Sequence, residues 1–311
     1  MNKSYAADLT LFAIAFVWGA TFVIVQNAIA FLDPNMFNAV RFAIAAFFLT
    51  VVLLIVSRNL RSIFSWKLVA AGVFIGFWLF GGYALQTVGL LYTSPSKAGF
   101  ITGLSVVLVP LFSYLILRDA IKWPAVVGVV LAVGGLYLLA FTGTLSLNLG
   151  DLLVFGCAVC FALQIVFTGK YAPHYEALPL AIVQLWVVSV LSLLYALFFE
   201  NWQQALVLET YLHADVFWGL LITSIFATAF AFLAQTALQK KTSATRVALI
   251  FALEPVFAAL TAYLWIDEVL TAKQLLGCVL IFSGMILAEL PISTWLASWK
   301  RAKLARSQSK Q

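Results

Sequence analysis

Glu254 is the one side chain able to carry a charge near the middle of a long apolar run, and Pro255 follows it. Proline has no backbone N–H, so it leaves a carbonyl one turn earlier without its helical partner. Apolar surroundings disfavour a charged carboxylate. We therefore expect Glu254 either to couple proton movement or bind a ligand amine, or to be a neutral glutamic acid that hydrogen-bonds between packed helices.

Glutamines and aromatic residues share helical faces in several other apolar runs. Trp78 and Gln86 are eight residues apart, and Gln235 occupies a similar place in a later run. Aromatic walls with a few fixed polar groups suit a small organic ligand, whereas the same residue types also join membrane helices by hydrogen bonds. The candidate ligand-binding residues are Trp18, Trp78, Gln86, Ser105, Phe161, Gln164, Gln235 and Glu254.

Three cations stand near the ends of apolar runs. Lys97 and Arg246 each lie at the start of one run. They could gate a passage or attract anionic groups, and the alternative is that they extend to lipid headgroups. Arg41, near the start of another run, is expected to be an interfacial anchor.

The sequence contains no pattern that indicates a cofactor, a metal or enzymatic catalysis. Cys157 and Cys160 form a CxxC without a further ligand nearby, so these two residues and Cys278 are expected to be small core residues. His174 and His213 stand in separate loops. The motifs HExxH and GxxxxGK[ST] are absent, which argues against a zinc protease and a self-contained ATP-driven pump. No basic patch interleaved with aromatic residues indicates a nucleic-acid partner.

Long apolar segments must position these side chains. Of the 311 residues, 64% are apolar and 10% are charged, and the mean hydropathy is +1.06. Soluble domains are about half apolar and about a quarter charged, and a porin-like barrel would alternate apolar and polar residues. We therefore predict an all-α protein in a lipid bilayer, with ten transmembrane helices of about 20 residues. The predicted spans are 9–31, 36–57, 68–91, 96–117, 123–142, 151–170, 178–199, 216–239, 244–265 and 272–292.

The positive charges indicate an orientation. With ten spans, fifteen of the eighteen Lys and Arg residues fall on the side that holds both termini, and the exceptions are Arg41, Lys97 and Lys273. Short cytoplasmic loops are rich in Lys and Arg. The prediction is a multi-pass protein of the plasma membrane, the inner membrane in a bacterium, with both termini in the cytoplasm. Residues 293–311 are predicted to be a basic cytoplasmic tail, with tryptophans that anchor it at the lipid interface.

The two halves of the chain resemble each other. Adding 149 to a residue number brings Gln86 onto Gln235 and Lys97 onto Arg246, and nearer the start an offset of 143 brings Asp8 onto Asp151. Five spans in each half are an odd number, so the second half is expected to lie upside down in the membrane. Such inverted repeats are typical of secondary transporters. The predicted repeats are residues 8–142 and 150–292.

Several short segments, in this order and spacing, carry a resemblance to a known family. The chain resembles the drug/metabolite transporter superfamily, in its EamA-like branch, over about residues 8–290. Where that family has a Gly-Glu turn this chain has Arg118-Asp119 and Asp267-Glu268. The segments are WGATF at 18–22, RF at 41–42, KAGF at 97–100, VVLVP at 106–110, GDLL at 150–153, LEPVFAA at 253–259 and the stretch from Gly277 to Gly284.

The resemblance implies a fold and an activity. It implies two inverted bundles of five helices, with the first, third, fourth, sixth, eighth and ninth helices around a central cavity. It also implies transport of a small organic solute such as an amino acid, a metabolite or a drug, often as export by alternating access. Phe161 matches an aromatic residue that is frequent in the family's sixth helix.

Other functions remain as alternatives at this point. A nucleotide-sugar or phosphate exchanger needs several buried cations, and the few candidates here lie near span ends, which favours neutral, zwitterionic or cationic solutes. A channel would need a selectivity filter or a ring of like charges, and a membrane enzyme would need a nucleophile with a base. The solute, the direction of transport, the coupling ion and the oligomeric state stay open.

Overall fold

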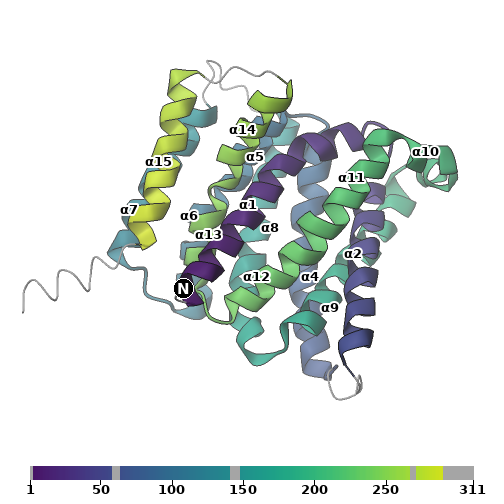
Figure 1. The fold of residues 1–311 in the computed structure, drawn as a ribbon, viewed down its shortest axis with the longest axis horizontal. Coiled ribbons are helices and arrows are strands. Elements are labelled where there is room, and N and C mark those ends of the chain that lie inside the picture. The colour runs from purple at the N-terminus through teal and green to yellow at the C-terminus, as the bar shows by residue number, and fades with distance from the viewer. Residues whose placement is uncertain (1–2, 58–63, 141–147, 267–270, 290–311) are drawn as a thin grey trace, which may run out of the picture.

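A computed structural model describes residues 3–57, 64–140, 148–266 and 271–289. These residues fold into helices, with no strand among them (Figure 1). The predicted basic tail and the turn at Asp267-Glu268 lie outside the described residues. The longer helices are α1 Lys3–Ala28, α2 Pro34–Val56, α4 Trp66–Gly89, α5 Pro95–Gly103, α6 Ser105–Phe112, α7 Trp123–Ala140, α8 Leu149–Tyr171, α9 Ala177–Phe199, α11 Ala214–Ser224, α12 Ala231–Gln239, α13 Ala244–Phe251, α14 Glu254–Ile266 and α15 Ala272–Glu289.

Short helical segments complete the described part of the chain. Two are π-helical, which is a wider winding that recurs at functional sites. One of these, η4, joins α11 to α12 without a break in the rod. The short segments are η1 Ser113–Leu117, η2 Ala172–His174, η3 Trp202–Leu206, α10 Leu208–Leu212 and η4 Ile225–Phe230.

Eight helical stretches are long and apolar enough to cross a bilayer. Two further apolar stretches, Trp123–Leu138 and Ala272–Leu287, are shorter. At 1.5 Å per residue such stretches reach about 24 Å, which is less than the roughly 30 Å of a hydrocarbon core. The protein is therefore a multi-pass membrane protein with at least eight spans by this measure, and the two shorter helices occupy the places of the fifth and tenth predicted spans.

The outer surface of the bundle is apolar. Large side chains such as Phe47, Ile55 and Phe198 are more than 60% exposed. A soluble protein rarely leaves so much apolar surface uncovered. In a membrane the same surface contacts lipid chains, so the exposed apolar residues fit the bilayer environment.

The predicted fourth and ninth spans are both interrupted, at equivalent places. The fourth span divides at Leu104 into α5 and α6, and the ninth divides at 252–253 into α13 and α14. Ser105 and Glu254, which are 149 residues apart, therefore each begin the second part of an interrupted helix. Interrupted helices are where transporters place binding groups, because the break exposes backbone and redirects side chains.

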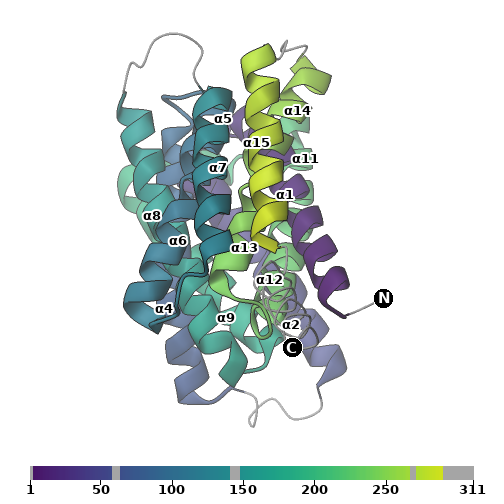
Figure 2. The same ribbon diagram turned by 90° about the vertical axis from the view of Figure 1, so that its left-hand side faces the viewer.

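Figure 2 shows where the elements begin and end along the bundle. The first helix starts at the right, below mid-height and above the lower ends of α2 and α4, whereas α5 lies at the upper end, close to α7 and α15 (Figure 2). The helices α7 and α15 lie side by side in both views (Figures 1 and 2). They form a pair at one side, so the remaining helices enclose the middle of the molecule.

The turn after η1 contains an unusual backbone conformation. Arg118 has φ 59°, in the left-handed region, and its side chain is exposed. A Cβ atom makes that region costly, so it is normally occupied by glycine. The next residue, Asp119, accepts a hydrogen bond from the Ser113 hydroxyl at 3.1 Å, which helps hold the turn.

Candidate functional site

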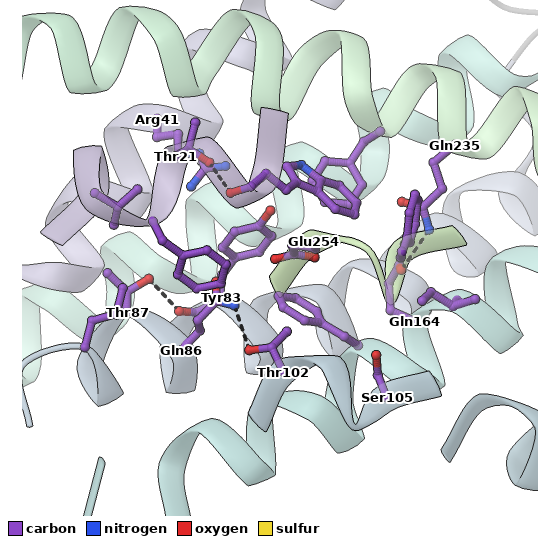
Figure 3. Close-up of a pocket in the computed structure, with 18 residues that line it drawn as sticks. Thr21, Arg41, Tyr83, Gln86, Thr87, Thr102, Ser105, Gln164, Gln235 and Glu254 are labelled. Atoms are coloured by element: carbon purple, nitrogen blue, oxygen red, sulfur yellow. Dashed lines mark hydrogen bonds between the residues drawn. The ribbon is translucent and has the colours of Figure 1, made fainter. Parts of the chain in front are cut away.

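A cavity lies in the middle of the bundle, and residues from both halves of the chain line it (Figure 3). Its walls come from α1, α2, α4, the two interrupted helices, α8 and α12. The lining residues are Trp18, Thr21, Phe22, Val25, Arg41, Tyr83, Gln86, Thr87, Leu90, Thr102, Ser105, Phe161, Gln164, Ile165, Phe232, Gln235, Phe251 and Glu254.

Fourteen of these eighteen residues form seven pairs related by the internal repeat. The offset of 143 relates the lining residues of α1 to those of α8, and the offset of 149 relates the remaining pairs. The cavity is therefore built from the same positions of both halves. The pairs are Trp18 with Phe161, Thr21 with Gln164, Phe22 with Ile165, Tyr83 with Phe232, Gln86 with Gln235, Thr102 with Phe251 and Ser105 with Glu254.

The two equivalent glutamines are held by short polar networks. Gln86 Nε2 donates to the Thr102 hydroxyl at 3.2 Å. Gln235 Nε2 donates to the side-chain oxygens of Gln164 at 3.2 Å and of Gln239 at 3.1 Å. These bonds fix the amides against the cavity wall, which serves helix association and also presents polar atoms to a ligand.

Aromatic rings form much of the remaining wall. Trp18 packs against Phe251 and Phe232 with ring centroids 4.7 and 5.5 Å apart. Its Nε1 donates to the Ala227 carbonyl in η4 at 2.8 Å, so the indole is fixed in place. The ring of Phe161 lies where a Cβ at Gly82 would stand, only 2.2 Å from it, so this close contact requires glycine.

Glu254 projects among these side chains from the start of α14 (Figure 3). Across the described residues, its carboxyl has no ion-pair partner and no side-chain hydrogen bond. Its repeat equivalent is the neutral Ser105. The Glu254 carboxyl therefore faces the cavity and not a neighbouring helix. This position fits a role in proton coupling or ligand binding better than a role in helix packing.

Arg41 also lines the cavity, and the expectation that it anchors at the membrane interface is wrong. Its residue exposure is 3%, and it lies two helical turns inside α2. Its Nε donates to the Thr228 hydroxyl of η4 at 2.7 Å, and its guanidinium carbon is 4.9 Å from the ring centre of Tyr83. Arg41 is buried because α4 and η4 pack against it, although its position in the sequence is close to the end of a predicted span.

Seven of the eight residues that the sequence suggested for ligand binding line this cavity, and Trp78 does not. Trp78 contacts Phe74 and Phe77, and its indole N–H is buried without a hydrogen-bond partner in the described structure. Eight residues of α-helix turn through about 80° beyond two full turns at 3.6 residues per turn. Trp78 is therefore rotated away from the direction in which Gln86 points.

Lys97 and Arg246 form ion pairs outside the cavity. Lys97 Nζ is 2.6 Å from Asp151 Oδ2, and Arg246 Nη2 is 2.6 Å from Asp8 Oδ2. The two acids are themselves repeat equivalents, as are the two cations. Each pair joins the start of a helix in one half to the first long helix of the other half. These contacts replace the expected alternative of free extension to lipid headgroups.

The two ion pairs differ in how firmly the acid is held. Asp151 is 2% exposed and also accepts from the Thr93 hydroxyl and from the Asn148 backbone, which completes a capping box at the start of α8. Asp8 is 26% exposed and receives two bonds from the Arg246 guanidinium. The Lys97 pair is therefore part of a larger network than the Arg246 pair.

The sequence reasoning missed eleven of the eighteen lining residues as ligand-binding candidates, and it also missed the two acids of the ion pairs. For Tyr83, Asp8 and Asp151 the repeat alignment contained a signal. Tyr83 aligns with Phe232, and Asp8 aligns with Asp151 at the start of each half. The three cysteines are free, and no group of metal-ligating side chains is found among the residues that the structure describes.

Comparisons with known proteins agree over almost the whole chain. The model of the EamA-like transporter family matches residues 5–141 and 148–290. An uncharacterized transporter of Archaeoglobus fulgidus is 36% identical over 290 residues, which cover 93% of this chain and 88% of the relative. The uncharacterized transporter YvbV of Bacillus subtilis is 27% identical over 292 residues, with 93% of each chain covered.

A solved crystal structure is similar to this fold. It superposes with a TM-score of 0.73 and covers 92% of this chain and 96% of that one. The sequence identity is 19%, so this likeness concerns the fold alone.

Proposed function

The chain belongs to the EamA-like transporter family, and from that premise we propose that it exports a small organic solute by alternating access. The observation that carries this proposal is the central cavity, whose walls use equivalent positions of both repeats in seven pairs. A cavity built in this way can be closed from either side by the same kind of movement in either half. The protein is a membrane transporter and not an enzyme.

The two equivalent ion pairs support a mechanism for the exchange of access. The Lys97–Asp151 pair and the Arg246–Asp8 pair each bridge the two halves. If one pair opens while the other stays closed, the cavity is exposed to one side only. The pairs occupy equivalent positions of the two repeats, so the same kind of bond can close the cavity in each of the two exposed states.

We further propose the arrangement of the chain in the membrane. Residues 8–142 and 150–292 act as the two repeats, the second inverted, and both termini and the tail 293–311 lie in the cytoplasm at a bacterial inner membrane. The distribution of Lys and Arg supports this orientation. The Lys97 pair then closes the external end of the cavity, and the Arg246 pair closes the cytoplasmic end.

The described cavity argues against an exchanger of nucleotide sugars or phosphates. Arg41 is the one cation among its lining residues, and Glu254 adds a carboxyl. A phosphate dianion needs several charge-assisted donors. A channel also finds no support, because the lining contains no ring of like charge.

The experiment that tests the proposal has two stages. Metabolite profiling of cells and medium, with and without overexpression, identifies solutes that the protein moves outward. Each solute is then tested for counterflow in proteoliposomes that contain the purified protein, with empty liposomes as control. We expect uptake that saturates and is stimulated by the same solute inside. Flux that rises linearly with concentration and shows no counterflow would indicate a channel instead.

A further inference from the structure

We infer that Arg41 binds a carboxylate of the transported solute, so that the solute is a small monocarboxylate with an apolar, preferably flat, body. The inference rests on the proposed transport function, since it assigns the central cavity to the solute. It differs from the sequence-based preference for neutral, zwitterionic or cationic solutes, which rested on Arg41 lying near a span end, because Arg41 is buried and lines the cavity.

Arg41 is a buried charge that lacks an acidic partner. Arg41 lies seven residues after the start of α2, which is about 10 Å along the helix axis at 1.5 Å per residue. Only 3% of the residue is exposed. Within the described ranges no carboxylate lies at ion-pair distance from it. A guanidinium keeps its charge in proteins, and a charge buried in a membrane protein is costly unless it is paired or functional.

Arg41 is one of the residues that line the cavity, and its guanidinium is held there by neighbouring side chains. Its Nε donates to Thr228, and the plane lies near the rings of Phe42 and Tyr83 at 5.4 and 4.9 Å. The guanidinium also interacts with the Tyr83 side chain, but no carboxylate among the described residues pairs with it. A planar fork of N–H groups held in this way matches the two oxygens of a carboxylate.

The other lining residues determine the shape and the charge of the remaining part of the solute. Six aromatic residues line the cavity, which suits a flat apolar body. Glu254 faces the same space, so an ionised Glu254 would repel a second negative charge on the solute, and a neutral Glu254 could offer that charge a single O–H donor but no cation. The single cation therefore favours one carboxylate over a phosphate or a dicarboxylate.

The charge of the cavity breaks the repeat symmetry at this position. The equivalent of Arg41 is Gln184, which is fully buried and donates to the Leu180 carbonyl within its own helix. Gln184 does not line the cavity. The first half thus contributes the cation and the second half contributes Glu254, so a bound solute has a defined orientation between the halves.

Binding of three monocarboxylates and their amides to the purified protein tests the inference. The probes are acetate, benzoate and 3-phenylpropanoate, each compared with its primary amide, and phenyl phosphate is added as a dianion. Binding is measured by the shift of the unfolding temperature with ligand concentration. We expect the acids to bind about 10- to 100-fold more tightly than their amides, with 3-phenylpropanoate the tightest and phenyl phosphate no tighter than benzoate.

Variants assign that preference to Arg41. Arg41→Gln should bind acid and amide alike, whereas Arg41→Lys, which keeps the charge without the fork, should keep a reduced preference. Arg118→Gln removes the same group from an exposed turn and should leave the preference unchanged. Monodisperse elution of each variant shows that it folds.

Each outcome supports or overturns the inference. It is overturned if no acid binds the unaltered protein, if acids and amides bind equally, if phenyl phosphate binds best, or if Arg41→Gln keeps the preference. A failure of the proposed function can be told apart from a failure of this inference. Acids that bind through Arg41 but show no counterflow would overturn the transport function and keep the carboxylate site. Counterflow of a solute without a carboxylate, unaffected by Arg41→Gln, would keep the transport function and overturn the carboxylate site.

Discussion

Glu254 and Ser105 occupy equivalent places at the breaks of the two interrupted helices, yet only one of them can ionise. The Glu254 side chain faces the cavity, and the residues described around it offer no ion-pair partner. A carboxyl in such a place can take up a proton from one side and release it to the other as access alternates. The competing role is a neutral hydrogen-bond donor that only supports packing.

Glu254→Gln separates the two roles. If the carboxyl carries the coupling proton, the variant should reach the membrane and keep counterflow, which needs no net proton movement, but lose transport driven by a pH gradient. If Glu254 only supports packing, the amide replaces it and the pH profile of transport stays as it was. Proteoliposomes with and without an imposed pH gradient provide both readings, and Ser105→Ala serves as the control at the equivalent position.

Arg118 is a residue whose backbone conformation disagrees with its type. Its φ of 59° costs a non-glycine residue about 1–2 kcal/mol. Glycine removes this cost, but it also increases the conformational entropy of the unfolded chain, which offsets part of the stabilisation. Arg118→Gly should therefore stabilise the protein by about 0.5–1 kcal/mol and raise its melting temperature by about 2 °C. Arg118→Ala removes the same charge without relieving the conformation, so an equal gain in both variants would contradict this explanation.

At the scale of elements, the packing of α7 against α15 depends on glycine at Gly135. A Cβ at Gly135 would lie 2.5 Å from the Gly277 carbonyl oxygen, whereas a Cβ at its neighbour Gly134 would meet nothing within 4 Å. Gly135→Ala should therefore destabilise the protein by about 1–3 kcal/mol through overpacking. Gly134→Ala should leave stability unchanged or raise it by about 0.5–1 kcal/mol.

Thermal unfolding of the two single variants measures this difference. Their order is the informative result, because both substitutions add the same methyl group to the same helix one residue apart. A Gly134→Ala protein that is the less stable of the two would show that α7 and α15 do not meet on the Gly135 face.

The helices and their family could be predicted from the sequence, because continuous apolar runs, turn residues and repeated motifs are local features. The family resemblance is confirmed by the match over both repeats. The orientation of single side chains was less accessible. Trp78 was placed on the face of Gln86, but the offset of eight residues rotates it out of the cavity.

Partners between distant elements were the hardest part to predict. The sequence pattern places Arg41 close to a span end, whereas α2 begins at Pro34 and Arg41 lies two turns inside it. Its contact with Thr228 depends on the π-helical η4, which no sequence pattern indicated. The acids opposite Lys97 and Arg246 were visible in the repeat alignment as Asp151 and Asp8, but their pairing depends on how the two halves pack.

At the scale of the whole molecule, the uneven distribution of cations predicts where the termini lie. Fifteen of the eighteen Lys and Arg residues fall on the side of the termini if the chain crosses ten times, and this side is normally the cytoplasm. A fluorescent protein fused after Gln311 should therefore fluoresce, and alkaline phosphatase at the same place should be inactive. The reverse pair of results would require a different number of spans or the opposite orientation.

The two ion pairs between the halves predict opposite effects when each is broken. Lys97→Gln should release the external end of the cavity, and Arg246→Gln should release the cytoplasmic end. The cations are about a third exposed, so solvent screens the pairs and each is worth about 0.5–1 kcal/mol. The population of the corresponding open state should then rise about 2- to 5-fold.

A cysteine at Gln235 in a variant without native cysteines reports which end is open, because Gln235 lines the cavity. Lys97→Gln should speed its labelling by an impermeant thiol reagent from outside and slow it from the cytoplasmic side, and Arg246→Gln should do the opposite. Exchanging the partners, Asp8→Arg with Arg246→Asp, should restore the original rates, since the pair is reformed in reverse. Lys273→Gln, an exposed cation at the start of α15, is the control for a change in net charge. Bonds at opposite ends of one cavity should change access to it in opposite directions when they are broken. Labelling shifts in the same direction for Lys97→Gln and Arg246→Gln would therefore mean that the pairs hold the halves together without controlling access.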